Sequence, residues 1–338
     1  MKIAFLMDRL DSINPIDDTT AHLMYECNQR GHIVFFLEPH DIYVRENEVV
    51  ARIYDLTVPP HLPIKKYWQM VRRCLKKDEL VFDVVIDLDV IFLRKNPPLQ
   101  YQTMEFLDPV SESVLEINST KGQILGNSKL YVLNFPDIIP ETHVSRDPRR
   151  LKRIIDDFGG DMVIKPLQRY GGEGVIKVSA ADRENLNSLI NYYSKSSRTY
   201  PEREPIMVQE YLDEVKREGD VRILLLNGQI LGAMRRKPKP GDFRTNVLAG
   251  ARAFRHEATA KERQLCRIIN QKLVDDGLYF VGIDVIGDKL VGINCMSPGG
   301  IPQINRLDNV KLEAKVIDFI EQRVREKAGF AHLQALGP

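Results

Sequence analysis

The sequence predicts an α/β protein built from more than one domain, and three observations support this. Its 338 residues exceed the roughly 100–200 residues of a typical domain. A short apolar run at 2–7, a helical pattern that ends at Gly31 and a second apolar run at 33–37 are typical of a parallel βαβ unit. Farther along, apolar runs flank the turn signals Asn227-Gly228 and Gly287-Asp288, which predicts antiparallel hairpins.

Composition and charge narrow the functional classes. The chain is 43% hydrophobic and 28% charged, as in ordinary soluble globular proteins. Its 48 Lys and Arg residues against 47 Asp and Glu leave a net charge of +1. A polyanion-binding surface needs a basic excess, so we expect no nucleic-acid partner. No apolar run reaches the roughly 18–20 residues that cross a bilayer, and residues 1–12 lack a signal-peptide cleavage site, so we expect no membrane association.

The cysteines are scattered and form no CxxC pair. This pattern favours free thiols in a reducing compartment, the cytoplasm, over a disulfide framework or a zinc site. The four residues are Cys27, Cys74, Cys266 and Cys295.

Residues 1–120 are expected to form an N-terminal open α/β domain. Residues 17–20, Asp-Asp-Thr-Thr, supply capping side chains for the helix that Gly31 ends. The apolar stretch at 83–94 contains another buried strand, which the prolines that follow it stop. The other elements expected here are a helix at about 101–109 and a strand at 114–117.

A second domain is expected over 121–328, with a lid subdomain at about 136–212 and a C-terminal subdomain at about 213–328. Two β-branched runs at 162–166 and 175–178 predict a hairpin with a glycine-rich, mobile tip. The other elements expected are helices at 121–134, 148–158, 182–196, 259–276 and 309–327, a strand at 206–212, hairpins at 221–236 and 278–295, a small-residue loop at 248–253 and a disordered tail at 329–338.

Two neighbouring features suit phosphate binding. Lys165 ends a strand in Val-Ile-Lys-Pro, where its ammonium group can lie over a nucleotide phosphate. In the turn that follows, backbone N–H groups of Gly171, Gly172 and Gly174 can approach phosphate oxygens because no Cβ intervenes. The turn matches neither GxGxxG nor GxxxxGKS/T. Taken alone, each feature also fits a plainer interpretation, a solvated lysine and an ordinary hairpin turn.

The segment Gln209-Glu210-Tyr211-Leu212 ends an apolar strand. Such a segment can present backbone N–H and C=O groups to an adenine edge, with apolar walls for the ring. Read alone, it also fits a simple strand exit.

Polar side chains interrupt the apolar strands of both C-terminal hairpins. Asp284 and Asn294 lie on the two strands of the second hairpin. A buried carboxylate is costly unless it is paired or metal-bound, and Mg²⁺ binds carboxylate and carbonyl oxygens. A hydrogen-bonded Asp–Asn pair is the alternative. Arg222 and Arg236, on the preceding hairpin, would supply positive charge to a transferring phosphoryl group or else form surface ion pairs.

Taken in order, these motifs resemble the ATP-grasp superfamily, and within it the family of bacterial glutathione synthetases. The order is VIKP, the glycine loop, QEYL, an Asp-x-Arg strand, RTN, LAG, VGIDVIGDKL and INCMSPGGI. MDRLDSINPIDDTT and FLRKNPP also look like the family's N-terminal part, so the likeness spans about residues 1–325. It implies an ATP-grasp fold with an N-terminal open α/β domain, a central lid domain and a C-terminal domain, with ATP between the sheets of the last two.

The resemblance also implies roles for individual residues. For the nucleotide they are Lys129, Lys165, Gly171, Gly172, Glu173, Gly174, Gln209, Glu210, Tyr211, Leu212 and Asp220; for the metal, Asp284 and Asn294; near the reacting phosphoryl group, Arg222 and Arg236; and for the other substrates, Asp18, Arg94, Arg244, Asn246, Ser297, Pro298, Gly299 and Gly300.

The implied chemistry is the activation of a carboxylate. The γ-phosphoryl group of ATP would pass to the C-terminal carboxylate of γ-glutamylcysteine, and the amine of glycine would then displace phosphate to form an amide. ATP and Mg²⁺, with Mn²⁺ as an alternative, are the implied cofactors. Small-molecule substrates and a homo-oligomer are the implied partners.

This sequence departs from the family pattern at three places. The family has Glu-x-Asn on its last metal-binding strand, and Gly292 stands at the glutamate position, which should weaken metal binding. Ala251 stands where the family often has a second glycine, and the 297–300 turn, SPGG, differs from the commonest form. Two other functions therefore stay open: a ligase for another amino acid or peptide acceptor, or a nucleotide-binding protein with weak or no turnover.

Overall fold

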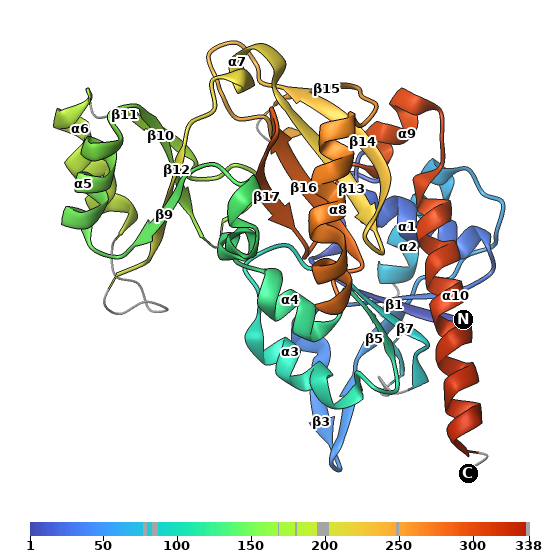
Figure 1. Ribbon diagram of the computed structural model, residues 1–338. Helices are drawn as coiled ribbons and strands as arrows, with labels where there is room; N and C mark the ends of the chain where they lie inside the picture. The colour runs from blue at the N-terminus through green and yellow to red at the C-terminus, as the bar shows by residue number, and fades with distance from the viewer. Residues whose placement is uncertain are drawn as a thin grey trace.

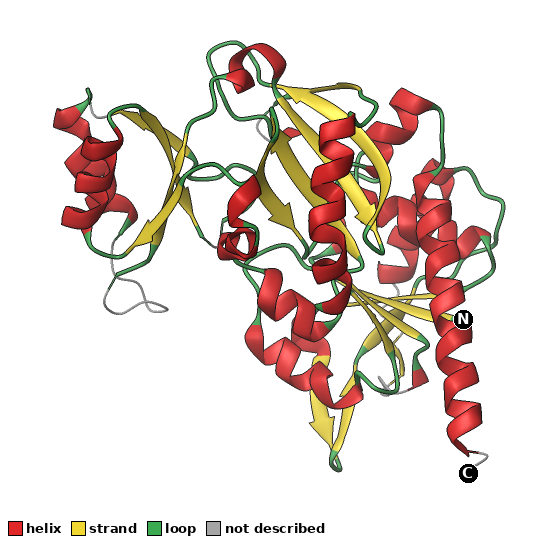
Figure 2. Ribbon diagram, viewed as in Figure 1, coloured by secondary structure: helices red, strands yellow, loops and turns green. Residues whose placement is uncertain are grey.

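The computed structural model describes residues 1–76, 80–82, 87–167, 169–179, 181–194, 203–247 and 250–335. In these residues the strands form a six-stranded, a four-stranded and a five-stranded sheet and one separate hairpin (Figure 1). Figure 2 shows helices packed against each of the three larger sheets. The predicted α/β class is confirmed.

The first part of the chain builds the six-stranded sheet. In sheet order its strands are β6 (Leu80–Phe82), β5 (Ile53–Asp55), β2 (Ile33–Leu37), β1 (Lys2–Leu6), β7 (Val90–Leu93) and β8 (Leu115–Ile117). The last four of these are parallel to one another, and β5 and β6 add an antiparallel edge. Helix α1 (Thr19–Gln29) connects β1 to β2, so the predicted βαβ unit is confirmed.

Further elements surround this sheet. Stacked side chains of Phe5 and Phe92, with ring centroids 5.5 Å apart, lie in its core. The elements are η1 (Leu10–Ser12), η2 (Pro39–Asp41), the hairpin β3 (Ile42–Arg45) and β4 (Glu48–Ala51), α2 (Ile64–Lys76), α3 (Tyr101–Leu107), η4 (Asp108–Val110) and α4 (Thr120–Gly126).

The four-stranded antiparallel sheet stands apart on the left of Figure 1. Alternate residues of its strand β10 (Asp161–Pro166) face opposite ways. Met162 and Ile164 pack against two helices, while Val163 and Lys165 line a cavity on the other face. The predicted hairpin of 162–166 with 175–178 is confirmed. In sheet order the strands are β11 (Ile176–Ser179), β10 (Asp161–Pro166), β12 (Ile206–Glu210) and β9 (Thr142–Ser145), and the helices are α5 (Pro148–Phe158) and α6 (Arg183–Tyr193).

The five-stranded antiparallel sheet forms the centre of the molecule (Figure 1). Its strands in sheet order are β15 (Arg252–Arg255), β14 (Gln229–Lys237), β13 (Asp220–Leu226), β16 (Phe280–Ile286) and β17 (Lys289–Asn294). Helix α8 (Ala260–Asp275) packs through Leu265, Ile269 and Leu273 on one face. The opposite face therefore carries the polar side chains of β13, β14 and β16, and both predicted hairpins are confirmed.

Asn118, which follows β8, joins the six-stranded sheet to the five-stranded sheet. Asn118 donates to the carbonyl oxygens of Phe280 and Cys295 at 2.8 and 2.6 Å and accepts from the Phe280 N–H at 2.6 Å. The remaining elements are η5 (Lys129–Asn134), η6 (Pro136–Ile138), α7 (Glu214–Glu218), α9 (Ile301–Asp308) and α10 (Leu312–Ala335).

Some expectations about local structure were wrong. The predicted loop at 248–253 ends earlier, because Arg252 and Ala253 pair with β14 as part of β15. The helix expected at 309–327 starts at Leu312 and continues to Ala335, through good helix formers, so most of the expected disordered tail is helical. Parts of four predicted elements, at 83–86, 195–196, 248–249 and 336–338, lie outside the described residues.

Two further findings concern the whole described chain. All four cysteines are free, as predicted. Every described helix is too short or too polar to cross a membrane.

Candidate active site

A cavity with about 1020 Å³ of open space lies between the four-stranded and the five-stranded sheet. One end is apolar and the other is charged, so the cavity suits a ligand with a flat apolar part and an anionic part. The apolar end is lined by Val163, Val175, Tyr211, Leu212, Val215, Phe243, Ile286 and Ile293. The charged end is lined by Lys129, Lys165, Asp220, Arg236, Asp284 and Asn294, and the remaining polar lining includes Gly171, Gly172, Gln209, Glu210, Arg244 and Asn246.

The apolar end is shaped by the segment after β12. The rings of Tyr211 and Phe243 meet edge to face, with centroids 5.9 Å apart. The ammonium group of Lys177 lies 4.4 Å from the Tyr211 ring centroid, in cation–π geometry. Backbone bonds from Glu210 to Glu141 and from Tyr211 to Asp161 hold this segment against the sheet. The result is a rigid slot for a planar ring, where the sequence predicts an adenine site.

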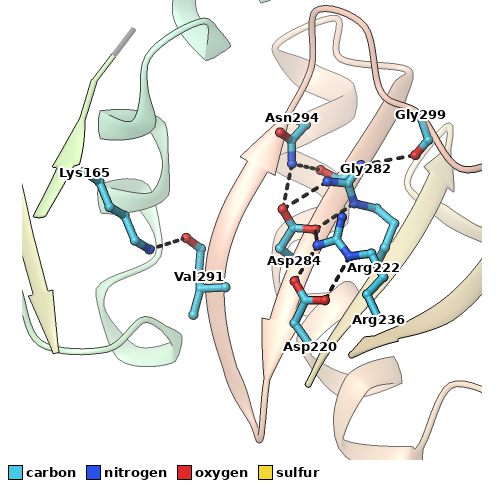
Figure 3. Close-up of polar contacts among 9 residues, drawn as sticks. All are labelled: Lys165, Asp220, Arg222, Arg236, Gly282, Asp284, Val291, Asn294 and Gly299. Atoms are coloured by element: carbon cyan, nitrogen blue, oxygen red, sulfur yellow. Dashed lines mark hydrogen bonds and ion pairs between the residues drawn. The ribbon is translucent and has the colours of Figure 1, made fainter. Parts of the chain in front are cut away.

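Lys165 bridges the two sheets at the charged end. Its Nζ donates to the Val291 carbonyl on β17 at 3.2 Å (Figure 3) and to the Gln209 side-chain oxygen on β12. Gln209 is oriented in turn by Thr142, to which its Nε2 donates at 2.7 Å. Gln209 thus contacts Lys165, a role that differs from the adenine contact expected of the QEYL segment. Burial lowers the pKa of Lys165 to about 8, although Asp284 and Asp220 oppose the shift.

Lys129 reaches the same end from η5. Its Nζ donates to the backbone carbonyls of Pro166 and Arg169, which begin the glycine turn. Burial, together with the nearby charges of Lys165 and Arg169, lowers its pKa to about 7. Two desolvated ammonium groups therefore lie at this end, and no carboxylate of the described residues is bonded to either, which favours an anionic ligand.

The glycine turn reaches the charged end from the four-stranded sheet. Gly171, Gly172 and Gly174 all have positive φ, between 62° and 81°. A Cβ on Gly172 would lie 2.4 Å from Oδ1 of Asn246, so that side chain would have to shift, and the φ of 81° at Gly172 itself favours glycine. Glu173 is outside the cavity lining and pairs with Arg169 in an exposed ion pair.

Two arginines and two aspartates form a buried network on the five-stranded sheet (Figure 3). Arg236 donates to Asp220 with Nε, at 2.8 Å, and with Nη2, and the same Nη2 reaches Asp284 Oδ1 at 2.7 Å. Arg222 holds Asp284 with Nε at 2.7 Å and Nη2 at 3.1 Å. Burial alone would raise the pKa of Asp284, but the two arginines outweigh it and hold that pKa well below its usual range.

Asp284 and Asn294 are the residues that could hold a divalent cation. The Asn294 amide nitrogen donates to Asp284 Oδ2 at 3.1 Å and to the Gly282 carbonyl at 3.2 Å, which leaves its carbonyl oxygen as a ligand atom (Figure 3). Among the described residues, no cluster of three or more His, Cys, Asp or Glu side chains could hold a metal. One carboxylate and one amide oxygen fit a Mg²⁺ ion that is also bound by substrate phosphates.

Gly292 lies directly opposite Asp284 in the pairing of β17 with β16, and it lines the cavity. A Cβ at this position would lie 3.6 Å from Asp284 Oδ2, an ordinary van der Waals distance. The backbone therefore has room for a larger side chain beside Asp284. Glycine here leaves the site with the carboxylate of Asp284 and without a second one from β17.

A second polar cluster lies outside the cavity, where α1, β7 and the turn before α9 meet. It is centred on Arg94, which is only 3% exposed. Arg94 Nε donates to Thr20 Oγ1, and its Nη2 donates to the Pro298 carbonyl, both at 3.0 Å. Its Nη1 is buried and has no hydrogen-bond partner in the described part of the chain.

Arg94 differs from Arg222 and Arg236 because, within the part of the chain that the structure describes, no carboxylate is bonded to it. Burial lowers its pKa to about 10, and the charge of Asp18 offsets this only in part. Asp18 itself caps α1, where its Oδ1 accepts from the Ala21 N–H at 2.9 Å. An unpaired buried cation is costly, so this geometry favours an anionic group at Nη1.

Arg222 connects the two clusters. Its Nη1 donates to the Gly299 carbonyl at 3.1 Å, one residue from the Pro298 carbonyl that binds Arg94. The predicted substrate residues Ser297, Pro298, Gly299 and Gly300 thus lie between the network and Arg94, whereas Arg244 and Asn246 lie at the cavity.

Several residues of the site went unpredicted from the sequence. The apolar wall residues Val163, Val215 and Phe243 carry no motif, and only sheet alternation could have indicated Val163. Thr19 and Thr20 were read as helix-capping residues, but both side chains bond to other elements.

The sequence of this chain matches those of known proteins over nearly its full length. Residues 1–122 match the N-terminal domain of prokaryotic glutathione synthetase, and residues 128–309 match the ATP-grasp domain of the same enzyme. The glutathione synthetase of Gloeobacter violaceus is 38% identical, over 96% of this chain and 98% of its own. That of Synechocystis sp. is 35% identical over 96% and 100%, and that of Brucella melitensis is 34% identical over 96% and 99%.

Solved structures show the same fold at low sequence identity. The D-cycloserine synthetase DcsG superposes with a TM-score of 0.64 at 14% identity, over 95% of this chain and 99% of that one. The VanG D-Ala:D-Ser ligase of Enterococcus faecalis gives 0.60 at 11% identity, over 94% and 99%. An ATP-grasp ligase of Chryseobacterium gregarium, solved with ADP and peptides, gives 0.60 at 12% identity, over 96% and 97%. The predicted ATP-grasp fold is confirmed.

Proposed function

The chain belongs to the family of prokaryotic glutathione synthetases, and we propose that its cavity and the adjoining Arg94 cluster are the two halves of that family's active site. The protein is an ATP-dependent carbon–nitrogen ligase that makes glutathione from small-molecule substrates. The observation that carries the proposal is Arg222, which is hydrogen-bonded both to Asp284 at the cavity and to Gly299 beside the Arg94 cluster.

In this proposal the cavity binds ATP. The slot around Tyr211 and Phe243 holds the adenine ring, with the backbone of Glu210 to Leu212 at its edge. Lys129, Lys165 and the glycine turn contact the phosphates as point charges and N–H donors. Both lysines have lowered pKa values in the absence of an anion, so phosphates would restore their charge.

Arg222 and Arg236 stabilise the negative charge on the phosphoryl group as it is transferred. The γ-phosphoryl group passes from ATP to the C-terminal carboxylate of γ-glutamylcysteine, and glycine's amine then attacks the acyl phosphate, releasing phosphate. The side chains form no covalent bond to the substrate in these steps, so catalysis consists of positioning and charge stabilisation. Asp220 and Asp284 hold the two guanidinium groups rigidly for this purpose.

The family uses a divalent metal, and we propose Mg²⁺, or Mn²⁺ in its place, held by Asp284 and Asn294. Such an ion would neutralise phosphate charge and orient the transferring group. The donor set fits one ion, since β17 presents Gly292 in place of a second carboxylate.

We further propose that the chain divides into an N-terminal domain over 1–120 and an ATP-grasp domain over 121–328, with lid and C-terminal subdomains that meet near residue 212. The two family matches, at 1–122 and 128–309, support this division. The free cysteines support a reducing compartment, the cytoplasm, as the place of action. A homo-oligomer is proposed from family resemblance.

A coupled assay of phosphate release tests the proposed site. Purified protein with ATP, Mg²⁺, γ-glutamylcysteine and glycine should release phosphate and form glutathione in equal amounts, detected by mass spectrometry. Arg222→Met should abolish the reaction while nucleotide binding persists, because Arg222 lies outside the cavity lining. Full activity of Arg222→Met would contradict the proposed connection of the two halves.

The same assay addresses the two alternatives. The altered Ser297–Gly300 turn favours another acceptor, and a panel of amino acids in place of glycine would reveal it by a higher kcat/KM. Gly292 favours weak turnover, and nucleotide binding without phosphate release would support that alternative.

A further inference from the structure

We propose that Thr20 and Thr19 are positioning residues of the peptide-substrate half of the site: Thr20 orients Arg94 to bind a substrate carboxylate, and Thr19 fixes the turn that completes this half. The inference rests on the proposed function, since it assumes that Arg94 meets the peptide. It concerns the first turn of α1, where the sequence alone indicates helix capping.

The guanidinium of Arg94 is held by two of its three nitrogens. Nε donates to the Thr20 hydroxyl and Nη2 to the Pro298 carbonyl, each at 3.0 Å. These two bonds define the plane of the group, and Nη1 is left as the nitrogen without a partner among the described residues. Thr20 therefore determines which nitrogen of Arg94 is offered to a ligand.

The surroundings make this orientation depend on Thr20. The Arg94 guanidinium carbon lies 5.8 and 5.6 Å from the ring centroids of Phe92 and Phe280, which offer no hydrogen-bond acceptor in the ring plane. Thr20 is 2% exposed, so water has little access to replace its hydroxyl. Without Thr20, Nε would be a buried donor with no acceptor, and the guanidinium would have reason to rotate.

Thr19 acts on the opposite wall of the same cluster. Its Oγ1 accepts from the N–H groups of Gly300 and Ile301, at 3.1 and 3.2 Å. These N–H groups belong to the N-terminal end of α9 and follow directly on the carbonyls that bind Arg94 and Arg222. Two adjacent threonines thus hold a cation and a turn from segments far apart in the sequence, since Arg94 and Pro298 are separated by 204 residues.

The hydroxyls are not needed by α1 itself. Asp18 is the N-cap and already satisfies the Ala21 N–H. Threonine hydroxyls inside helices usually bond back to their own helix, whereas the hydroxyl oxygens of Thr19 and Thr20 accept hydrogen bonds from other elements. A role limited to helix stability does not account for these contacts.

The substrate group that binds Arg94 Nη1 can be inferred from its charge and from the position of Arg94 relative to Arg222. γ-Glutamylcysteine carries two carboxylates, and the one that reacts must reach the arginines of the cavity. Arg94 is separated from Arg222 by the Pro298–Gly299 peptide, which suits the other, non-reacting carboxylate of an extended dipeptide. Glycine, with a single carboxylate next to its amine, has no group for this distance.

Steady-state kinetics of Thr20→Val tests the proposal. Valine keeps the shape and removes the acceptor, so we expect the KM for γ-glutamylcysteine to rise about 10- to 100-fold, while the KM for ATP stays within about twofold. Thr20→Ser keeps the hydroxyl and should restore the wild-type KM. Thr103→Val is the matched control, because Thr103 is similarly buried and its hydroxyl donates, within the described residues, to Gln100 at 3.4 Å.

A double-mutant cycle separates positioning from stability. If Thr20 acts through Arg94, Thr20→Val should add little to the KM defect of Arg94→Gln. Thr20→Ala gives a second variant should valine prevent folding, and thermal melts monitor both. Equal rises in the KM for ATP and for the peptide, or additive effects in the cycle, would overturn the proposal.

The outcome for the wild type keeps the two proposals distinct. If wild-type protein releases phosphate with γ-glutamylcysteine and glycine but Thr20→Val has an unchanged peptide KM, the positioning role fails and the proposed function stands. If wild-type protein shows no turnover with these substrates, the proposed function fails. Calorimetry of γ-glutamylcysteine binding to wild type and to Thr20→Val then tests the positioning role, which requires that Thr20→Val binds the peptide more weakly than wild type.

Discussion

The two halves of the site treat buried charge in opposite ways. In the cavity, Asp284 and Asp220 neutralise Arg222 and Arg236 inside the protein, so the network is complete before any ligand arrives. In the second cluster, Arg94 is equally buried, but its partners among the described residues are a hydroxyl and a carbonyl. The first arrangement gives rigidity at the reacting group, and the second reserves one charge for a substrate.

Replacing the carboxylate that joins the two arginines should have the largest effect. Asp284→Asn leaves Arg222 and Arg236 facing each other with less negative charge, so we expect a loss of about 3–5 kcal/mol in the free energy of unfolding. Activity should fall about 100- to 1000-fold as the arginines lose their positions. Urea titration and phosphate release measure the two effects. A variant with near-normal stability would show that the network is not internally neutralised.

Removing a charge reserved for phosphate should weaken binding more than folding. Lys165→Met should reduce ATP affinity about 10- to 100-fold, measured by calorimetry, because a charge-assisted hydrogen bond is lost. The melting temperature should not fall, since burial already disfavours the ammonium group in the free protein. Lys152→Met is the control, because Lys152 lies on α5 outside the cavity lining and pairs with Asp156 at 3.0 Å. A large fall in melting temperature with unchanged affinity would contradict this view.

Adding the carboxylate that β17 lacks should strengthen metal binding. Gly292→Glu places an acid beside Asp284, where the backbone leaves room, and should lower the Kd for Mn²⁺ in the ADP complex about 10-fold or more. Electron paramagnetic resonance of free Mn²⁺ measures this Kd. Gly292→Gln has the same size without the charge and should have a much smaller effect. Equal changes in both variants would mean that packing, and not charge, limits the metal site.

Nucleotide binding should weaken as the pH rises through the range of about 7 to 8. The pKa values of Lys129 and Lys165 are lowered to about 7 and 8 in the free protein, and bound phosphates would raise them, so binding takes up protons. We expect ADP affinity to fall by up to about tenfold per pH unit between pH 7 and 8, where one lysine is deprotonated, and by up to about a hundredfold per pH unit above pH 8, where both are. Calorimetry in buffers of different ionisation enthalpy counts the protons taken up. A flat profile from pH 6.5 to 9 would contradict the assignment.

The smallest effect is expected at the exposed end of the glycine turn. Glu173 and Arg169 form an ion pair with both side chains 58% exposed. Such pairs contribute little, so Glu173→Gln should change ATP affinity by less than about twofold. A large loss of affinity would mean that Glu173 contacts the nucleotide, as the family resemblance implies, and that its charge serves the ligand and not the ion pair with Arg169.

Much of the cavity could be predicted from the sequence because its residues lie in local patterns. Lys165 ends an apolar strand, the glycines follow within one turn, and Asp284 interrupts an apolar run, so each stands out without knowledge of the fold. The hairpins at Asn227-Gly228 and Gly287-Asp288 were also predictable, since Asn227, Gly228 and Gly287 have the positive φ that such turns require.

The remaining features depend on register and on contacts between distant segments. Arg222 meets Asp284 because the two residues are paired across β13 and β16, and Gly292 continues the same row on β17. A shift of one residue in either pairing would turn these side chains to the other face of the sheet. From the sequence, Thr20, which binds Arg94, and Thr19, which binds the turn before α9, could be predicted only as helix-capping residues. Their partners lie far away in the chain.

The sequence by itself determined the fold class, the family and the chemical types of the site residues, since strand and turn patterns and spaced motifs are local properties of the chain. Only the tertiary structure decided which charges are neutralised and which are left for substrates. Hydrogen bonding and burial depend on the sheet register and on the packing of α1 against the turn before α9, so no local pattern could separate the paired Arg222 from the unpaired Arg94.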